Sequence, residues 1–307
     1  MDRLRYHGTF WDSARWDDLQ LRPGDIIVAT PPKSGTTWTQ MICALLIFQD
    51  PELPRPLGTI SPWIDMVTKP RKEVVADLAG QQHRRFLKTH TPLHGLPLDP
   101  HVTYLCVGRD PRDVAMSMDR HAANLNIEQL LQDRAHAAAA DGVVLEPPRP
   151  SPPALPDARD RFWRWVEDDS DPTDTTSSLR STLHQLESFW NAPNDLDVVL
   201  LHYDDLLADL EGQMRGLADR LDITVPEQRW PTLVEAAGLD AMRRRTALTA
   251  PGATRSQWHD PAQFFHKGTS GQWHDLLGPD DLARYASRAR SLAPPELVAW
   301  VHRDRLD

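Results

Sequence analysis

The sequence predicts an α/β fold, a single domain in which a central parallel sheet is flanked by helices. Four short apolar runs, at 25–30, 85–90, 102–108 and 198–203, alternate with segments of helical periodicity. This alternation is typical of parallel strands joined by right-handed crossovers. A chain of 307 residues with 40% hydrophobic content can also bury a sizeable core.

The first apolar run leads directly into the segment Pro-Pro-Lys-Ser-Gly-Thr-Thr-Trp at 31–38. Thr36 and Thr37 open an apolar stretch, which predicts a helix with hydroxyls in its cap region. Gly35 permits the sharp turn between strand and helix. Backbone N–H groups converge at such a helix N-terminus, which carries roughly half a positive charge. Lys33 adds a full charge, so we expect a P-loop-like loop that holds a phosphate or a sulfate. It is not a Walker A loop, in which lysine follows glycine.

Composition argues against several other classes of protein. The net charge is −10 and no dense basic run occurs, which disfavours general nucleic-acid binding. Cys43 and Cys106 lie in apolar runs and are expected to be reduced core residues. No apolar segment approaches the ~20 residues of a membrane span, and the N-terminus lacks a signal-peptide core. No acidic or histidine cluster has metal-ligand spacing. We therefore expect a soluble cytoplasmic protein that needs no metal.

Polar residues follow the second and third apolar runs. Lys88 and His90 are two apart at a strand end, so their side chains share a face. Such a pair is more often plain polar surface, but the carboxyl ends of parallel strands are where ligands bind. Arg109 ends the third run, and Pro111 begins a predicted helix that carries Ser117. Arg109 and Ser117 could hold one phosphate together.

Three separated motifs resemble those of the cytosolic-type sulfotransferase family, whose members use 3′-phosphoadenosine 5′-phosphosulfate (PAPS). The segment 31–38 resembles the family's 5′-phosphosulfate loop. Arg109, residues 113–115 and Ser117 match its 3′-phosphate element, R-x-x-x-D-V-A-x-S. His-Lys-Gly-Thr-Ser-Gly-Gln-Trp at 266–273 resembles the second 3′-phosphate element, R-K-G-x-x-G-D-W.

The second 3′-phosphate element departs from the family at two positions. His266 replaces the arginine and Gln272 replaces the aspartate. A histidine can donate to phosphate, but its charge depends on pH. We therefore expect a weaker contact there, or compensation by Arg245 or Arg255.

The resemblance implies a cofactor site and places the adenine near Tyr203. Leu239 stands where family members often have an aromatic residue, which leaves Trp38 as the main stacking candidate. The implied cofactor-binding residues are Lys33, Ser34, Gly35, Thr36, Thr37, Trp38, Arg109, Ser117, Tyr203, His266, Lys267 and Gly268.

The resemblance also implies how four residues would act. His90 would take the proton of the acceptor hydroxyl, a role worth about 10²–10⁴-fold. Lys33 would stabilise the leaving oxygen, and Lys88 would neutralise the sulfuryl oxygens. Ser117 would hold Lys33 away from the sulfate until an acceptor binds. The nucleotide product would be 3′,5′-adenosine bisphosphate.

The resemblance leaves residues 133–178 unmatched. We expect a nucleotide-binding core at 25–132 and 179–275, with 133–178 as an inserted, partly mobile acceptor-side lid. Prolines are dense around 147–153, which disfavours core helix or strand there. Trp163 and Trp165 would anchor the insertion, although a disordered surface loop is an equal alternative.

The resemblance implies that the acceptor is a hydroxyl compound, either a small molecule or a glycolipid. Ser61-Pro62-Trp63 and the segment 82–86 look like mycobacterial glycolipid sulfotransferases. The expected acceptor-binding residues are Trp63, Ile64, His90 and Trp163. The sequence does not identify the acceptor or the oligomeric state.

Two other functions remain open on the sequence. A nucleoside-type kinase would use a similar loop, but it needs carboxylates for Mg²⁺. A catalytically silent nucleotide-binding module would have no need of Lys33, Lys88, His90 and Ser117 together.

Overall fold

A computed structural model describes residues 3–148 and 155–306 of the chain. Its sheet has the strand order β2-β1-β3-β4, and every neighbouring pair is parallel. The predicted α/β class with a central parallel sheet is therefore confirmed. The strands are β1 (Ile26–Ala29), β2 (Phe86–Thr89), β3 (Thr103–Gly108) and β4 (Asp197–His202).

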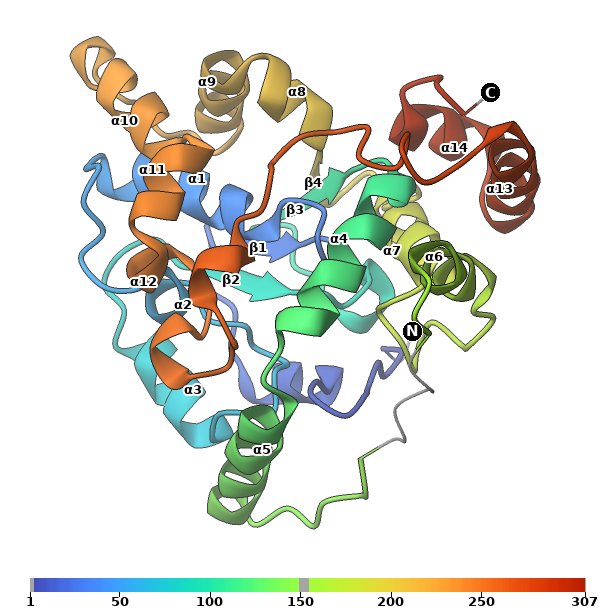
Figure 1. The fold of residues 1–307 in the computed structure, drawn as a ribbon. Helices are drawn as coiled ribbons and strands as arrows, with labels where there is room; N and C mark the ends of the chain where they lie inside the picture. The colour runs from blue at the N-terminus through green and yellow to red at the C-terminus, as the bar shows by residue number, and fades with distance from the viewer. Residues whose placement is uncertain (1–2, 149–154, 307) are drawn as a thin grey trace.

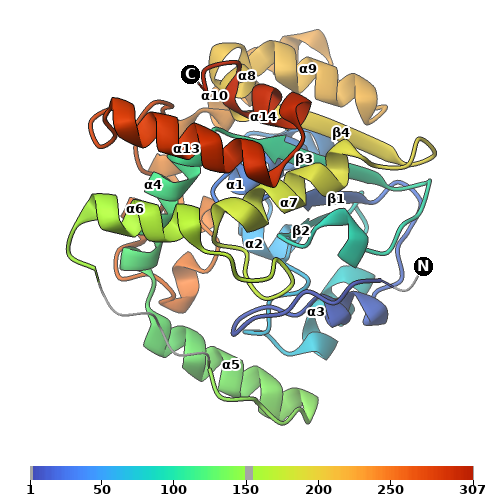
Figure 2. The ribbon, with the colours of Figure 1, turned by 90° about the vertical axis from the view of Figure 1, so that its right-hand side faces the viewer.

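Helices cover both faces of the sheet and extend from its edges (Figures 1 and 2). They are α1 (Thr36–Phe48), α2 (Leu57–Ile60), α3 (Arg71–Ala79), α4 (Pro111–Asn124), α5 (Ile127–Asp141), α6 (Ala158–Glu167), α7 (Leu179–Trp190), α8 (Tyr203–Ala208), α9 (Leu210–Arg220), α10 (Trp230–Ala237), α11 (Leu239–Arg244), α12 (Thr246–Thr249), α13 (Pro279–Leu292) and α14 (Pro295–His302).

Alternating strand residues divide the core into two hydrophobic layers. Ile27 and Tyr104 face the layer that contains α7, α13 and α14. Ile26 and Leu105 face the opposite layer, which contains α1, α9 and α10. Side chains on both faces are buried because successive residues of a strand point to opposite sides. Cys43 and Cys106 are buried free thiols, as predicted.

The sheet has a switch point between β1 and β3. The chain crosses from β1 to one neighbour, β2, and then passes to β3 and β4 on the other side. In open parallel sheets the loops diverge at such a point and leave a crevice at the carboxyl ends of the strands. The loop of residues 30–35 follows β1, and Arg109 follows β3.

The helical segment that follows β4 is divided. It forms α8 and α9, which meet at Asp209 in a non-helical conformation (φ −147°, ψ 77°). The Asp209 carboxylate accepts the N–H of Gly212 and caps α9. Aspartate competes with helical hydrogen bonds in this way, so it begins a new helix.

Much of the region 133–178 is ordered helix. α5 reaches Asp141 and projects from the body in both views (Figures 1 and 2), and α6 packs beside α7. Trp163 and Trp165 of α6 are buried in the core. The alternative of a disordered loop is therefore wrong for α6. Prolines 150, 152 and 153 lie outside the described residues.

No helix among residues 3–148 and 155–306 is long and apolar enough to cross a membrane.

Candidate functional site

A cavity of about 430 Å³ lies at the carboxyl ends of the strands. It collects most of the residues that the sequence singles out, although they come from all four strand ends and from the 266–272 loop. The predicted residues that line it are Lys33, Gly35, Thr36, Thr37, Trp38, Trp63, Lys88, His90, Arg109, Ser117, Tyr203, His266, Lys267 and Gly268.

Three predicted site residues do not line this cavity. Ser34 is fully buried beneath the loop, and its N–H donates to the Pro31 carbonyl. Ile64 packs in the core behind β2. Trp163 also packs in the core, and its indole N–H donates to Asp281 at 3.0 Å. Trp163 belongs to the apolar face of an amphipathic helix, so the structure does not support the expected acceptor contacts of Ile64 and Trp163.

The loop after β1 makes the sharp turn that the sequence predicts. Lys33 and Gly35 adopt left-handed conformations, with φ of 65° and 106°. A Cβ atom on Gly35 would lie 3.1 Å from the Tyr203 ring, so a larger residue would displace that ring. Arg109 donates to the Lys33 carbonyl at 2.9 Å and joins the loop to β3. Strain held by such contacts is common at ligand sites.

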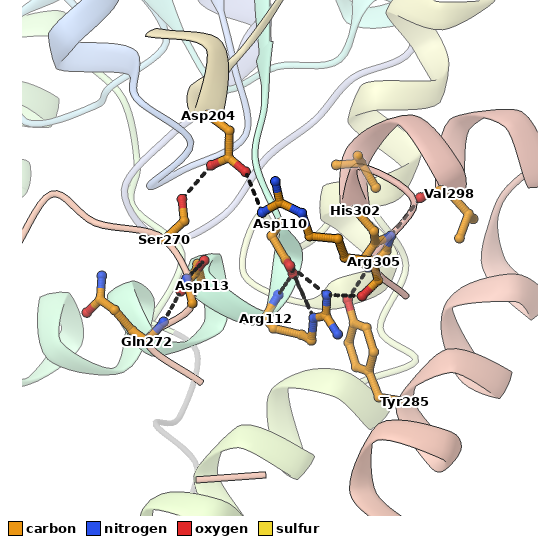
Figure 3. Close-up of polar contacts among 12 residues, drawn as sticks. Asp110, Arg112, Asp113, Asp204, Ser270, Gln272, Tyr285, Val298, His302 and Arg305 are labelled. Atoms are coloured by element: carbon orange, nitrogen blue, oxygen red, sulfur yellow. Dashed lines mark hydrogen bonds and ion pairs between the residues drawn. The ribbon is translucent and has the colours of Figure 1, made fainter. Parts of the chain in front are cut away.

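The 266–272 loop is fixed against α4. The Asp113 carboxylate accepts the N–H groups of Gly271 and Gln272, each at 2.8 Å (Figure 3). Arg109 donates to the Thr269 carbonyl at 3.1 Å. The two segments that resemble 3′-phosphate elements are therefore in direct contact.

Further polar contacts hold the surroundings of this loop. The Ser270 hydroxyl donates to Asp204 at the start of α8 (Figure 3). On the other side of α4, buried Arg112 pairs with Asp110 at 2.7 Å and donates to the Arg305 carbonyl at 2.9 Å. These contacts tie the 266–272 loop to α8 and the first turn of α4 to the C-terminal segment.

His90 has one ring nitrogen fixed and the other available. Nδ1 lies 2.7 Å from the Thr30 carbonyl oxygen. A carbonyl only accepts hydrogen bonds, so Nδ1 carries the proton and Nε2 is the free acceptor. Burial lowers the pKa of His90 well below its usual value, and the charges of Lys88 and Lys33 lower it further. His90 is therefore neutral at pH 7.

Lys88 lies beside His90 and above the Trp63 ring, with Nζ 4.5 Å from the ring centroid. Burial lowers the pKa of Lys88 to about 8, against the opposing effect of Asp65. Asp65 is itself buried and accepts hydrogen bonds from the hydroxyls of Thr89 and Thr91. Burial raises the pKa of Asp65, and these hydrogen bonds oppose that rise.

Lys33 contacts His121 rather than Ser117. Its Nζ lies 3.5 Å from His121 Nδ1 and 4.7 Å from the centroid of the Phe264 ring. Burial, and to a smaller extent the positive charges of Arg109, Lys88 and Arg120, lower the pKa of Lys33 to about 7. Burial also lowers the pKa of His121 well below its usual value, so its neutral ring can accept from the ammonium.

Sequence reasoning missed the residues that form the other walls. Arg120 and His121 are three and four positions after Ser117, on the same face of α4, and that helical spacing could have revealed them. The remaining walls are mostly apolar and come from separate segments that no local motif connects. The residues of these walls that the sequence did not indicate are Phe10, Trp11, Met66, Met118, Leu125, Leu130, Thr176, Ser177, Trp258 and Phe264.

The cavity is strongly cationic. Lys33, Lys88, Arg109, Arg120 and Lys267 line it, and no Asp or Glu does so in the described part of the chain. Within those same residues, no group of three or more His, Cys, Asp or Glu could hold a metal ion. An anionic ligand with more than one negative group suits this lining, because each buried cation needs a negatively charged partner.

Comparisons with known proteins show the family to which the chain belongs. A family model described as the sulfotransferase domain matches residues 23–292. A glycolipid sulfotransferase of Mycobacterium bovis is 43% identical over 318 residues, which cover 99% of this chain and 95% of that protein. A glycolipid sulfotransferase of Mycobacterium tuberculosis is 44% identical over 317 residues, with the same coverage.

Two solved structures share the fold. A mouse sulfotransferase complexed with PAP has a TM-score of 0.68 at 16% identity, covering 95% of this chain and 92% of that one. A retinol dehydratase in complex with retinol and PAP has a TM-score of 0.67 at 21% identity, covering 93% and 87%. The family match spans most of the chain and the mycobacterial relatives span nearly all of it, so this protein belongs to the sulfotransferase domain family and is a sulfotransferase.

Proposed function

We propose that the protein transfers the sulfuryl group of PAPS to a hydroxyl group of an amphipathic acceptor of the glycolipid type. The observation that supports this most is the meeting of Lys33, Lys88 and His90 in one cavity, which no Asp or Glu lines among the residues that the structure describes. The mycobacterial relatives are named glycolipid sulfotransferases, which supports the acceptor class.

The residues present fit PAPS. The loop around Lys33 provides converging N–H groups for the 5′ end. Arg109 and Ser117 line the same cavity and would hold the 3′-phosphate. Trp38 and Tyr203 form an edge-to-face pair with centroids 5.4 Å apart, which offers an aromatic wall for the adenine. When bound, PAPS supplies an activated sulfuryl group.

Three residues of the protein would have separate roles in the reaction. His90 Nε2 accepts the proton of the acceptor hydroxyl as the hydroxyl oxygen attacks sulfur. Lys88 neutralises charge on the sulfuryl oxygens, and Lys33 stabilises the phosphate oxygen that leaves. As in phosphoryl transfer, positioning and charge stabilisation supply most of the rate.

The acceptor side combines apolar and polar walls. Trp63 forms an edge-to-face contact with His90, with centroids 4.8 Å apart, so it would position the acceptor beside the base. Thr176 and Ser177 line the cavity from the 133–178 region. They support the proposal that this region is an acceptor-side lid on a core formed by 25–132 and 179–275.

The nucleotide site can be tested by thermal unfolding. We expect 3′,5′-adenosine bisphosphate to raise the melting temperature far more than AMP, because we propose separate sites for its 5′- and 3′-phosphates. Binding to the native state adds RT ln(1 + [L]/Kd), about 2.7 kcal/mol at a hundredfold excess. Equal shifts would contradict a 3′-phosphate site. A screen of hydroxyl acceptors with ³⁵S-labelled PAPS then identifies the acceptor, and ATP with Mg²⁺ tests the kinase alternative.

A further inference from the structure

The 266–272 loop lacks the arginine of the family's second 3′-phosphate motif. Neither Arg245 nor Arg255, the expected substitutes, lines the cavity. Arg245 donates to the carbonyls of Pro51 and Ala236. Arg255 pairs with Asp133 at 3.2 Å and lines a separate, smaller pocket. The prediction that one of them compensates is not supported by these positions.

His266 is a poor replacement for an arginine. His266 is an exposed residue. Its slight burial, together with the positive charges of Arg120, Lys267 and Arg243, lowers its pKa below the usual value. A neutral histidine therefore predominates at pH 7. Lys267 is then the one lysine or arginine of the 266–272 loop, so a second cation has to come from another element.

Arg120 is a cation without a counterion at this place. It lines the cavity from α4, one turn beyond Ser117. Its Nε is buried without a hydrogen-bond partner, and it forms no ion pair within residues 3–148 and 155–306. The adjacent carboxylate, Asp119, is paired with Arg161 at 2.7 Å instead.

Gln272 orients Arg120 without neutralising it. Arg120 donates to the Gln272 amide oxygen at 2.7 Å. The Gln272 amide nitrogen donates to the Thr269 carbonyl at 2.8 Å, which fixes the side chain. A carboxylate at position 272, as in the family motif, would form an ion pair with Arg120. The glutamine leaves the positive charge available to a ligand.

We propose that Arg120 binds the 3′-phosphate of the nucleotide in place of the missing loop arginine. The two departures from the family motif are then linked, because His266 removes a cation and Gln272 leaves Arg120 unneutralised. This inference rests on the proposed function, since it assumes that the ligand has a 3′-phosphate.

Equilibrium binding of 3′,5′-adenosine bisphosphate and of AMP to Arg120→Gln tests the proposal. We expect the bisphosphate Kd to rise at least tenfold and the AMP Kd to change less than threefold. Arg255→Gln is the matched control and should change neither. Equal losses for both nucleotides, or no loss for either, would overturn the role of Arg120.

Gln272→Glu tests the same idea without removing Arg120, and it does so even if Arg120→Gln fails to fold. The two side chains have the same shape, but glutamate would pair with Arg120, so bisphosphate binding should weaken about tenfold while AMP binding stays within threefold. Unchanged bisphosphate binding would overturn the proposal. If the wild-type protein itself does not prefer the bisphosphate over AMP, the proposed function fails as well.

Discussion

Nucleotide binding should be coupled to proton uptake, because two cavity lysines are partly neutral before the ligand arrives. The pKa is about 7 for Lys33 and about 8 for Lys88. Both groups should be fully charged beside phosphate and sulfate groups. At pH 8, Lys33 would therefore take up about 0.9 proton and Lys88 about 0.5, whereas the total at pH 6 is about 0.1.

The sign of the pH dependence follows from this uptake. A bound pKa above the free pKa means that affinity decreases as pH rises through the free values, by about tenfold per pH unit where one proton is taken up. Calorimetric titration of the bisphosphate at pH 8 in two buffers of different ionisation enthalpy measures the uptake. We expect about 0.9 proton for the wild type, from Lys33, and close to none for Lys33→Met, because the bisphosphate has no sulfuryl group to keep Lys88 charged.

Lys69→Met is the matched control, because burial lowers the pKa of Lys69 too but this residue does not line the main cavity. It should leave the uptake unchanged. An uptake below about 0.3 proton in the wild type at pH 8 would refute the reasoning that the buried lysines of the cavity are partly neutral until the nucleotide binds.

Two other variants examine how the site is held. In the wild type the Asp113 carboxylate accepts the N–H groups of Gly271 and Gln272. Asp113→Asn should therefore loosen the 266–272 loop, with faster amide exchange at these two residues and roughly tenfold weaker bisphosphate binding. Unchanged exchange would contradict this. His121→Phe keeps a ring but removes the nitrogen beside Lys33, so acceptor-independent breakdown of PAPS should rise several-fold while the bisphosphate Kd stays within about threefold. An unchanged breakdown rate would show that His121 does not restrain Lys33.

The parts of the site that the sequence predicted are formed by short contiguous segments. In the 31–38 segment, one strand, one turn and one helix start determine the geometry, and the left-handed Gly35 is confirmed. Lys88 and His90 share a face because strand periodicity requires it, and both line the cavity.

The missed and misplaced residues depend on tertiary packing. Trp163 has the same local pattern whether it covers a ligand or the core, and only its contact with α13 through Asp281 decides. Phe10, Leu130 and Trp258 meet at the cavity from distant segments, so no local period could join them. Arg120 was predictable from helical spacing, but its importance depends on the contact with Gln272.

The most direct test of the account is the turnover number of His90→Ala, normalised to the fraction of protein that binds 3′,5′-adenosine bisphosphate. The nucleotide is held by other residues, so its affinity should remain near that of the wild type. The normalised kcat should fall about 10²-fold or more, because the neutral Nε2 is the proposed base. His184→Ala, a half-buried histidine outside the cavity, should keep the wild-type rate. A normalised rate for His90→Ala within about threefold of wild type, a barrier change under roughly 0.7 kcal/mol, would contradict the account.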